Sequence, residues 1–310
     1  ALIGTDHIML YGLISVNAIL AISHAFSGTS FRSYVVSLVE KDRLVDFNAK
    51  LEVISQIISI SSPLLAYLFV DRFGLKPTLL LDSLTFFLSF ALVLSSRHQE
   101  KHVEGPREAA SVGAILRDIR EGLLFIFHEK EVFFLLVVAA LVNFFIAAYN
   151  YLIPFSNHLF SDSSSYATLL SMGAAGSILG ALFAKKLFQN SHTSLLFSLA
   201  LSGIGLALIT PLAMFGLPAV IISSGNLIFE FFLTIFNIHF FSMVQKKVPN
   251  ELLGRVFSSI FTVAVIFMPL ATSLMTALPF SVHILTFAVL GLAILLMSGL
   301  AFLYSRLNLN

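Results

Sequence analysis

Long apolar segments, separated by short polar ones, dominate this chain and predict helices that cross a membrane. Such a helix needs about 20 mostly apolar residues, because it rises about 1.5 Å per residue through a hydrocarbon core about 30 Å thick. Nine segments qualify: 8–30, 52–70, 76–96, 132–154, 166–186, 193–213, 217–242, 256–276 and 282–305. A closed β-barrel would instead alternate apolar and polar residues along each strand. Stretches such as Phe133 to Ala140 are continuously apolar, which favours an all-α integral membrane protein.

The composition excludes several other classes of protein. The mean hydropathy is +0.94 and 11% of the residues are charged, whereas a soluble domain has about 25%. The absence of cysteine excludes disulfide scaffolds and thiolate metal sites, and the net charge of +1 argues against a nucleic-acid partner. No phosphate-binding loop, cluster of metal ligands or nucleophile–histidine–acid set stands out. We therefore expect a protein that is not an enzyme and carries no cofactor or metal.

The basic residues predict how the helices are oriented. If successive loops lie on alternating sides of the membrane, one side holds only Arg72 and Lys76. All the other lysines and arginines fall on the opposite side: Arg32, Lys41, Arg43, Lys50, Arg97, Lys101, Arg107, Arg117, Arg120, Lys130, Lys185, Lys186, Lys246, Lys247, Arg255 and Arg306. Lys and Arg are retained on the cytoplasmic side of a membrane. The sequence therefore predicts a cytoplasmic C-terminus and an Ala1 that begins outside.

The longest polar stretch, 97–131, predicts a cytoplasmic central loop. Its first half is charged and contains a Gly-Pro pair, which is typical of a flexible linker. Its second half places Ile115, Ile119, Leu123 and Ile126 on one helical face, which predicts an amphipathic helix on the inner membrane surface. An early start of the next span would explain the same pattern.

Two predicted cytoplasmic loops are similar in sequence. They run from Ser37 to Ala49 and from Lys246 to Ser258. An offset of 209 residues aligns Val39 with Val248, and the same offset aligns Asp42 with Glu251 and Leu44 with Leu253. Each loop precedes a span that contains a proline, Pro63 or Pro269. Duplicated halves are typical of secondary transporters.

The repeat also predicts a larger architecture. Three spans precede the span that leads to the second loop, but none precedes the corresponding span 8–30. We therefore expect three more helices upstream of Ala1, so that nine of twelve transmembrane helices are present. Residues 1–96 would be the remaining three helices of an N-terminal bundle, 97–131 the central loop, and 132–310 a C-terminal six-helix bundle.

Three motifs resemble the major facilitator superfamily, in particular the branch that includes macrolide-efflux and enterobactin-export proteins. They are Gln245 to Ser258 (with its Val-Pro and Gly-Arg-Val), Leu81 to Phe87, and Arg120-Glu-Gly122. The resemblance covers essentially the whole chain. It implies two bundles, a central cavity, alternating access and a bacterial inner membrane. Asp71 to Pro77 is similar to the superfamily's acidic-glycine-basic signature. The span count places this segment between a different pair of helices from the pair that carries the signature in the superfamily, so we interpret it as a turn.

One acidic residue, Glu230, lies at mid-span. A charge at the bilayer centre costs about 2.5–3.5 kcal/mol or more, so it should face a cavity or a partner. Ser223, Asn226, Thr234 and Asn237 share its helical face. This polar stripe predicts a proton-coupling residue, Glu230, with Asn226, Thr234 and Asn237 in the substrate cavity. The alternative is a protonated Glu230 that holds neighbouring helices together.

Other residues predict weaker cavity and gating positions. Further cavity candidates are Asn17, His24, Asn143 and Asn150, on spans that line the cavity in the resemblance. Glycines 173, 176 and 180 predict close helix packing, with a hinge as the alternative. The gating candidates are Glu251, Gly254, Arg255, Pro63 and Pro269. Glu251 and Arg255 should pair with a neighbouring helix and close the cytoplasmic mouth.

Together these features predict a monomeric, multi-pass transporter in the bacterial inner membrane. Its partners would be the lipid bilayer, protons and a small-molecule substrate. We expect proton-coupled efflux of hydrophobic or amphipathic solutes by alternating access. The alternatives are an uptake symporter and a non-transporting membrane protein, either a sensor or a degenerate remnant.

Overall fold

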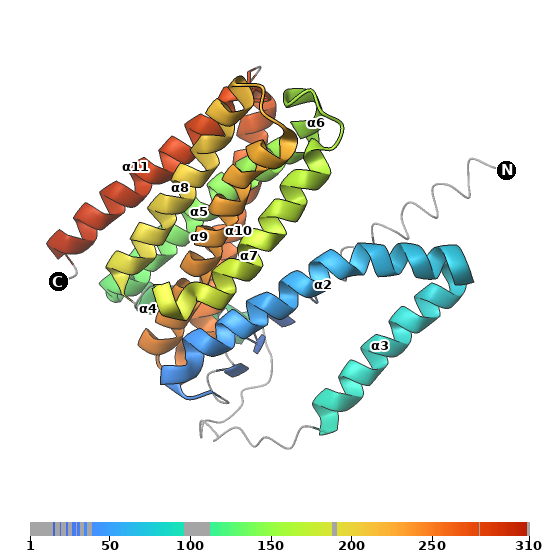
Figure 1. The fold of residues 1–310 in the computed structure, drawn as a ribbon. Coiled ribbons are helices and arrows are strands. Elements are labelled where there is room, and N and C mark those ends of the chain that lie inside the picture. Colours follow the sequence, from blue (N-terminus) through green and yellow to red (C-terminus); the bar gives the residue numbers. More distant parts are fainter. Residues whose placement is uncertain are drawn as a thin grey trace.

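The computed structural model describes residues 39–95, 112–187, 191–278 and 280–308, together with single positions between 15 and 35. Every regular element in these ranges is helical (Figure 1). The helices of at least 17 residues are α2 (Leu44–Phe73), α3 (Leu75–Ser95), α4 (Val112–His128), α5 (Lys130–Leu152), α7 (Ser165–Leu187), α8 (His192–Met214), α9 (Ala219–Lys247), α10 (Leu253–Ala277) and α11 (Leu285–Asn308). Short helical turns join them: η1 (Lys41–Arg43), η2 (Ile153–Phe155), α6 (Ser156–Leu159) and η3 (Asn250–Leu252).

Seven helical stretches in the described residues are long and apolar enough to cross a membrane. They are α3, α5 with its continuation through α6, α7, α8, α9, α10 with η3, and α11. These correspond to seven of the nine predicted spans, and the all-α integral membrane class is confirmed. The predicted span 52–70 lies within α2. The predicted span 8–30 lies largely outside the described residues.

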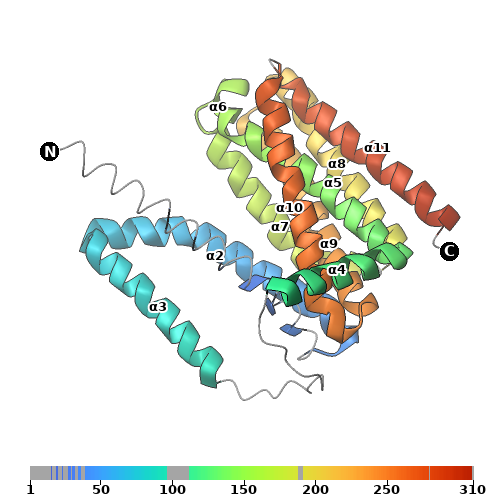
Figure 2. The same ribbon diagram turned by 180° about the vertical axis from the view of Figure 1, so that it is seen from behind.

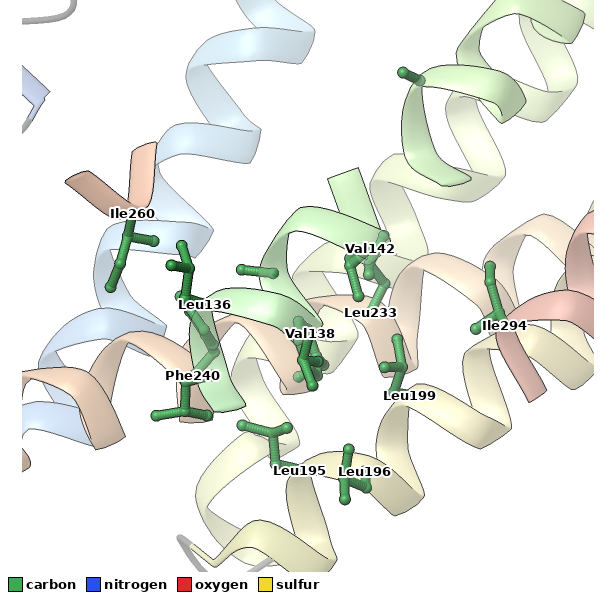
Figure 3. Close-up of a cluster of buried hydrophobic side chains, with 14 of the residues drawn as sticks. Leu136, Val138, Val142, Leu195, Leu196, Leu199, Leu233, Phe240, Ile260 and Ile294 are labelled. Atoms are coloured by element: carbon green, nitrogen blue, oxygen red, sulfur yellow. The ribbon is translucent and has the colours of Figure 1, made fainter. Parts of the chain in front are cut away.

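Helices α5 and α7 to α11 form one bundle with a shared apolar core. Figure 3 shows part of this core, to which α5 contributes Leu136, Val138 and Val142, and α8 contributes Leu195, Leu196 and Leu199. Because lipid tails are as apolar as leucine, such helices associate mainly through close packing. Glycines allow that approach. A Cβ built on Gly203 of α8 would lie 2.6 Å from the Gly291 carbonyl oxygen of α11.

The glycine stripe of α7 packs directly on α9. A Cβ on Gly176 would collide with the Leu227 carbonyl oxygen, and one on Gly180 would collide with that of Phe231. A Cβ on Gly173 would lie 2.7 Å from Asn226 Nδ2. The predicted packing role of the three glycines is therefore confirmed. This close packing brings the α9 backbone against α7 at the level of the polar residues of α9.

The sequence repeat is also a structural repeat. The 3-10 turn η1 leads into α2 at Leu44, and the 3-10 turn η3 leads into α10 at Leu253. Both leucines are buried, with exposed fractions of 0% and 1%. The offset 253 − 44 = 209 equals the offset of the sequence match. The two segments therefore enter their helices through the same local structure.

Helix α4 is separate from α5, because Glu129 between them has an extended backbone (φ −90°, ψ 94°). One side of α4 packs on α10, where a Cβ on Gly122 would lie 2.8 Å from the Arg255 carbonyl oxygen. Ile126 is fully buried, whereas Phe127 is 62% exposed. The second half of the central loop is thus a docked amphipathic helix and not an extension of α5.

Helix α2 contacts the bundle at its beginning and then diverges from it (Figures 1 and 2). Val45 packs against α7 and α9, whereas Ile54, Ile57 and Ile58 are all more than 50% exposed. A sharp turn at Gly74, whose φ of +81° favours glycine, leads into the exposed helix α3. The first turns of α2 therefore carry its contacts with the bundle.

Candidate functional site

A buried hydrogen-bond network joins three helices around Asn226 of α9. The Tyr149 hydroxyl of α5 donates to Asn226 Oδ1 at 2.6 Å, and Asn226 Nδ2 donates to the Leu169 carbonyl oxygen of α7 at 2.8 Å. Tyr149 and Asn226 are each 2% exposed. Buried polar groups need such partners. In this structure the Asn226 amide therefore ties the helices together and does not face open space.

Glu230 lies one turn further along α9 and is partly exposed. The Ser177 hydroxyl of α7 donates to Glu230 Oε2 at 3.3 Å. A Cβ on Gly173 would lie 3.3 Å from Glu230 Cγ, so the acidic side chain lies against the glycine stripe. Glu230 also interacts electrostatically with Glu52 of α2. A mid-span carboxyl of α9 therefore lies against the glycine stripe of α7.

The other cavity candidates, and Ser223 on the same polar stripe, have different surroundings within the described part of the chain. Thr234 is 3% exposed, and Ser223 is fully buried with a hydroxyl that has no hydrogen-bond partner among the described residues. Asn237 is partly exposed. Asn143 donates to the Ala139 carbonyl oxygen of its own helix at 2.9 Å. Asn150 is exposed, and Asn17 and His24 lie outside the described residues.

The predicted gating loop makes an ion pair with a helix from the central loop. Arg255 at the start of α10 pairs with Glu121 of α4. Glu251 and Gly254 are exposed, and within the described chain no ion pair involves Glu251. Pro269 lies inside α10. Pro63 lies inside α2, although its side chain is outside the described part.

A second polar contact joins the beginning of α2 to the ends of α7 and α9. Asn48 Nδ2 donates to Gln245 Oε1 at 2.8 Å and to Ser242 Oγ at 3.0 Å. Beside it, Lys185 Nζ of α7 lies 2.5 Å from Asp46 Oδ2. The α7 and α9 ends carry basic residues, and with the end of α11 they form what we call the basic end of the bundle.

The family model of the Major Facilitator Superfamily matches residues 4–272. The chain belongs to the Major Facilitator Superfamily. This superfamily member is also similar in fold to the crystal structure of a bacterial homologue of the iron transporter ferroportin in an outward-facing state. The TM-score is 0.67 and the sequence identity 18%, over 91% of this chain and 69% of that chain. No curated protein sequence matches the chain.

Membership of the superfamily makes this a multi-pass membrane transport protein, a class whose members are generally not enzymes. The iron transport named for ferroportin is not carried over to this chain, because the sequence identity is 18%. Among the described residues, no group of three His, Asp or Glu side chains could hold a metal ion. The likeness to the macrolide-efflux and enterobactin branch stays a prediction.

Two motifs that carry the sequence likeness to the superfamily meet in space. Glu121 and Gly122 of the Arg-Glu-Gly motif contact Arg255 of the Gly-Arg-Val motif. The offset of 209 residues places Arg255 at the repeat position of Asp46, and both residues pair with a neighbouring helix. The prediction that Arg255 pairs with a neighbouring helix is confirmed, whereas the corresponding prediction for Glu251 is not.

Sequence reasoning missed Tyr149 and Asn48 in this member of the superfamily. Tyr149 precedes the predicted Asn150, and one residue along a helix turns the side chain by about 100°. A tyrosine in an apolar helix was itself a signal, because a buried phenol seeks a hydrogen-bond partner. Asn48 lies within the first repeated loop, and nothing in its neighbours in sequence points to Gln245.

Proposed function

We propose that this protein is a proton-coupled exporter of hydrophobic or amphipathic cationic solutes that works by alternating access. The observation that carries the proposal is the position of Glu230, which is partly exposed at mid-span and held by Ser177. A carboxyl at that depth is costly to keep charged. It therefore suits a site that a proton or a cation occupies in turn.

The second carboxyl nearby supports a cationic solute. Glu52 on α2 interacts electrostatically with Glu230 on α9, and two ionised carboxyls repel each other more strongly where water is scarce. A proton on Glu230 removes this repulsion, and so does a bound cation. A solute cation that occupies the site would expel the proton, so that binding and coupling occur at one residue.

The contacts at the basic end support alternating access. Asn48 and Asp46 hold the beginning of α2 against α9 and α7, while the rest of α2 diverges. We propose that the basic end is cytoplasmic and closed here, because Lys and Arg are retained on that side. Export requires these contacts to break when Glu230 faces the cytoplasm. Efflux, a monomeric state and a bacterial inner membrane are part of the proposal and rest on the sequence resemblance.

The test is transport of a fluorescent lipophilic cation by inside-out vesicles that contain the protein expressed from its native gene. An imposed pH gradient, acidic inside, should drive accumulation of the dye. Glu230→Gln keeps the shape and hydrogen bonding of the side chain but cannot ionise. It should abolish the pH-driven part of dye accumulation, because an amide cannot bind and release the proton whose downhill movement drives export.

Asp71→Asn is the matched control, since Asp71 is exposed in the last turn of α2. Its transport should equal that of the parent. Transport by Glu230→Gln that is as fast and as pH-dependent as in the parent would leave Glu230 a structural residue. Proton-driven movement of solute in the opposite direction would favour an uptake symporter.

A further inference from the structure

A basic pocket lies between α8, α9 and α11 at the basic end, away from Glu230. Its volume is about 250 Å³, and its lining includes Lys246, Lys247, Arg306, His192 and Ser191. Ser191 and His192 begin α8, where the helix dipole also favours an anion. Three cationic side chains and a helix N-terminus thus converge on one cavity.

The pocket keeps an excess of positive charge. Lys247 pairs with Glu131 of α5, and it also interacts electrostatically with Glu129. His192 Nε2 lies 3.5 Å from the same Glu131 carboxylate. Within the described chain, no carboxylate forms an ion pair with Lys246 or Arg306. Two cations therefore remain for a ligand after the acidic groups are satisfied.

His192, which lines the pocket, has a buried ring nitrogen without a hydrogen-bond partner among the described residues. His192 Nδ1 is inaccessible to solvent and makes no hydrogen bond with any described residue. The side chain as a whole is 18% exposed. An unpartnered nitrogen in such a place is unusual, because buried polar atoms are normally hydrogen-bonded.

An apolar groove begins where the basic pocket ends. The groove lies between α8 and α11, has a volume of about 240 Å³, and shares Thr193 with the pocket. Its lining extends from Thr193 to Ala200 on α8 and from Leu295 to Phe302 on α11. Seven residues of helix correspond to about 10 Å along the axis. The groove therefore runs about 10 Å from the basic end along α8 and α11, two helices that are long and apolar enough to cross a membrane.

Arg306 connects the two spaces. Its guanidinium group lies 5.0 Å from the centre of the Phe302 ring, so a cation that lines the pocket stacks on an aromatic ring that lines the groove. A headgroup with negative charge and an attached hydrocarbon chain match this order of environments. Basic pockets between transmembrane helices on the cytoplasmic side bind anionic lipid headgroups elsewhere.

We propose that this pocket and groove form a binding site for an anionic phospholipid of the membrane leaflet at the basic end. The phosphate lies between Lys246 and Arg306, and one acyl chain lies in the groove beside Gly299. This site is distinct from the Glu230 site, and the inference does not depend on the solute, the direction of transport or proton coupling. The lipid bridges α8, α9 and α11 at the basic end.

The test is native mass spectrometry of the detergent-purified protein with lipids of identical acyl chains. Phosphatidylglycerol should be retained and phosphatidylcholine lost at the same collision energy. Each basic side chain beside an anionic headgroup strengthens binding about fivefold. The double variant Lys246→Gln/Arg306→Gln should therefore weaken the binding of phosphatidylglycerol about 25-fold, whereas Arg306→Lys should largely keep it. Lys130→Gln, at an exposed lysine that does not line the pocket, should match the parent.

A second variant separates a lipid from a free anion. Nothing lies within 4 Å of a Cβ built on Gly299, so Gly299→Leu can fill the groove without moving the backbone. It should weaken lipid binding and leave inorganic phosphate without effect. Three results would overturn the proposal. These are equal retention of both lipids, an equal loss of binding in Lys130→Gln, and full displacement of phosphatidylglycerol by inorganic phosphate.

Discussion

The contact between Asn48 and α9 should control how readily the basic end opens. Asn48 Nδ2 donates two hydrogen bonds, to Gln245 Oε1 and Ser242 Oγ, and Asn48 is 6% exposed. An intramolecular hydrogen bond contributes about 1 kcal/mol net. Asn48→Ala removes both bonds and should favour the open state by about 2 kcal/mol, which is a population shift of about 30-fold.

The neighbouring ion pair provides the control, because it is more exposed. The Lys185 and Asp46 side chains are 64% and 37% exposed, and surface ion pairs contribute about 0–1 kcal/mol. Asp46→Asn should therefore shift the same equilibrium at most about fivefold. The two variants change residues two positions apart on one helix, so they differ mainly in the burial of the bonds they remove.

The assay is a distance distribution between two spin labels, one on α2 and one on α7. The chain has no cysteine, so Lys50→Cys and Lys186→Cys place labels at two exposed positions without background. Asn48→Ala should increase the longer-distance population far more than Asp46→Asn does. An unchanged distribution in Asn48→Ala, or an equal shift in both variants, would refute the reasoning from burial.

Three further predictions test the packing, the gate and the topology. Gly176→Ala should destabilise the detergent-solubilised protein by about 1–3 kcal/mol, since its Cβ collides with α9. Gly299→Ala should be neutral or stabilise by up to about 1 kcal/mol, and a lower melting temperature than that of Gly176→Ala would contradict this. Arg255→Ala should lower transport while expression stays normal, and the charge swap Glu121→Arg/Arg255→Glu should restore transport. Normal transport by Arg255→Ala would exclude a gating role. Reporter fusions should place residue 74 outside and residues 103 and 247 inside, and an inside signal at residue 74 would contradict the span count.

The helices and the repeat could be predicted because their signals are local. Spans follow from the length of apolar runs, and the turns before Leu44 and Leu253 follow from short matching segments. The glycine stripe of α7 was also readable, because residues three and four apart share a helical face. In a membrane, such a stripe of small residues marks a packing surface.

The partners of polar residues could not be predicted because they depend on how helices rotate and dock. Asn226 looked like a cavity residue, yet Tyr149 and Leu169 bind its amide. Glu251 and Arg255 are four residues apart, yet Arg255 alone of the two reaches α4. Periodicity shows which residues share a face. It does not show which helix, 77 or 134 residues away in sequence, will meet that face.

The most direct test of the account is whether a solute expels a proton from Glu230. The purified protein in weakly buffered detergent solution is titrated with a lipophilic cation while the pH and the bound cation are both measured. We expect protons to be released in proportion to the cation bound, and no release from Glu230→Gln even where it still binds the cation. Equal proton release by the parent and by Glu230→Gln would contradict the central claim, as would binding by the parent without any release.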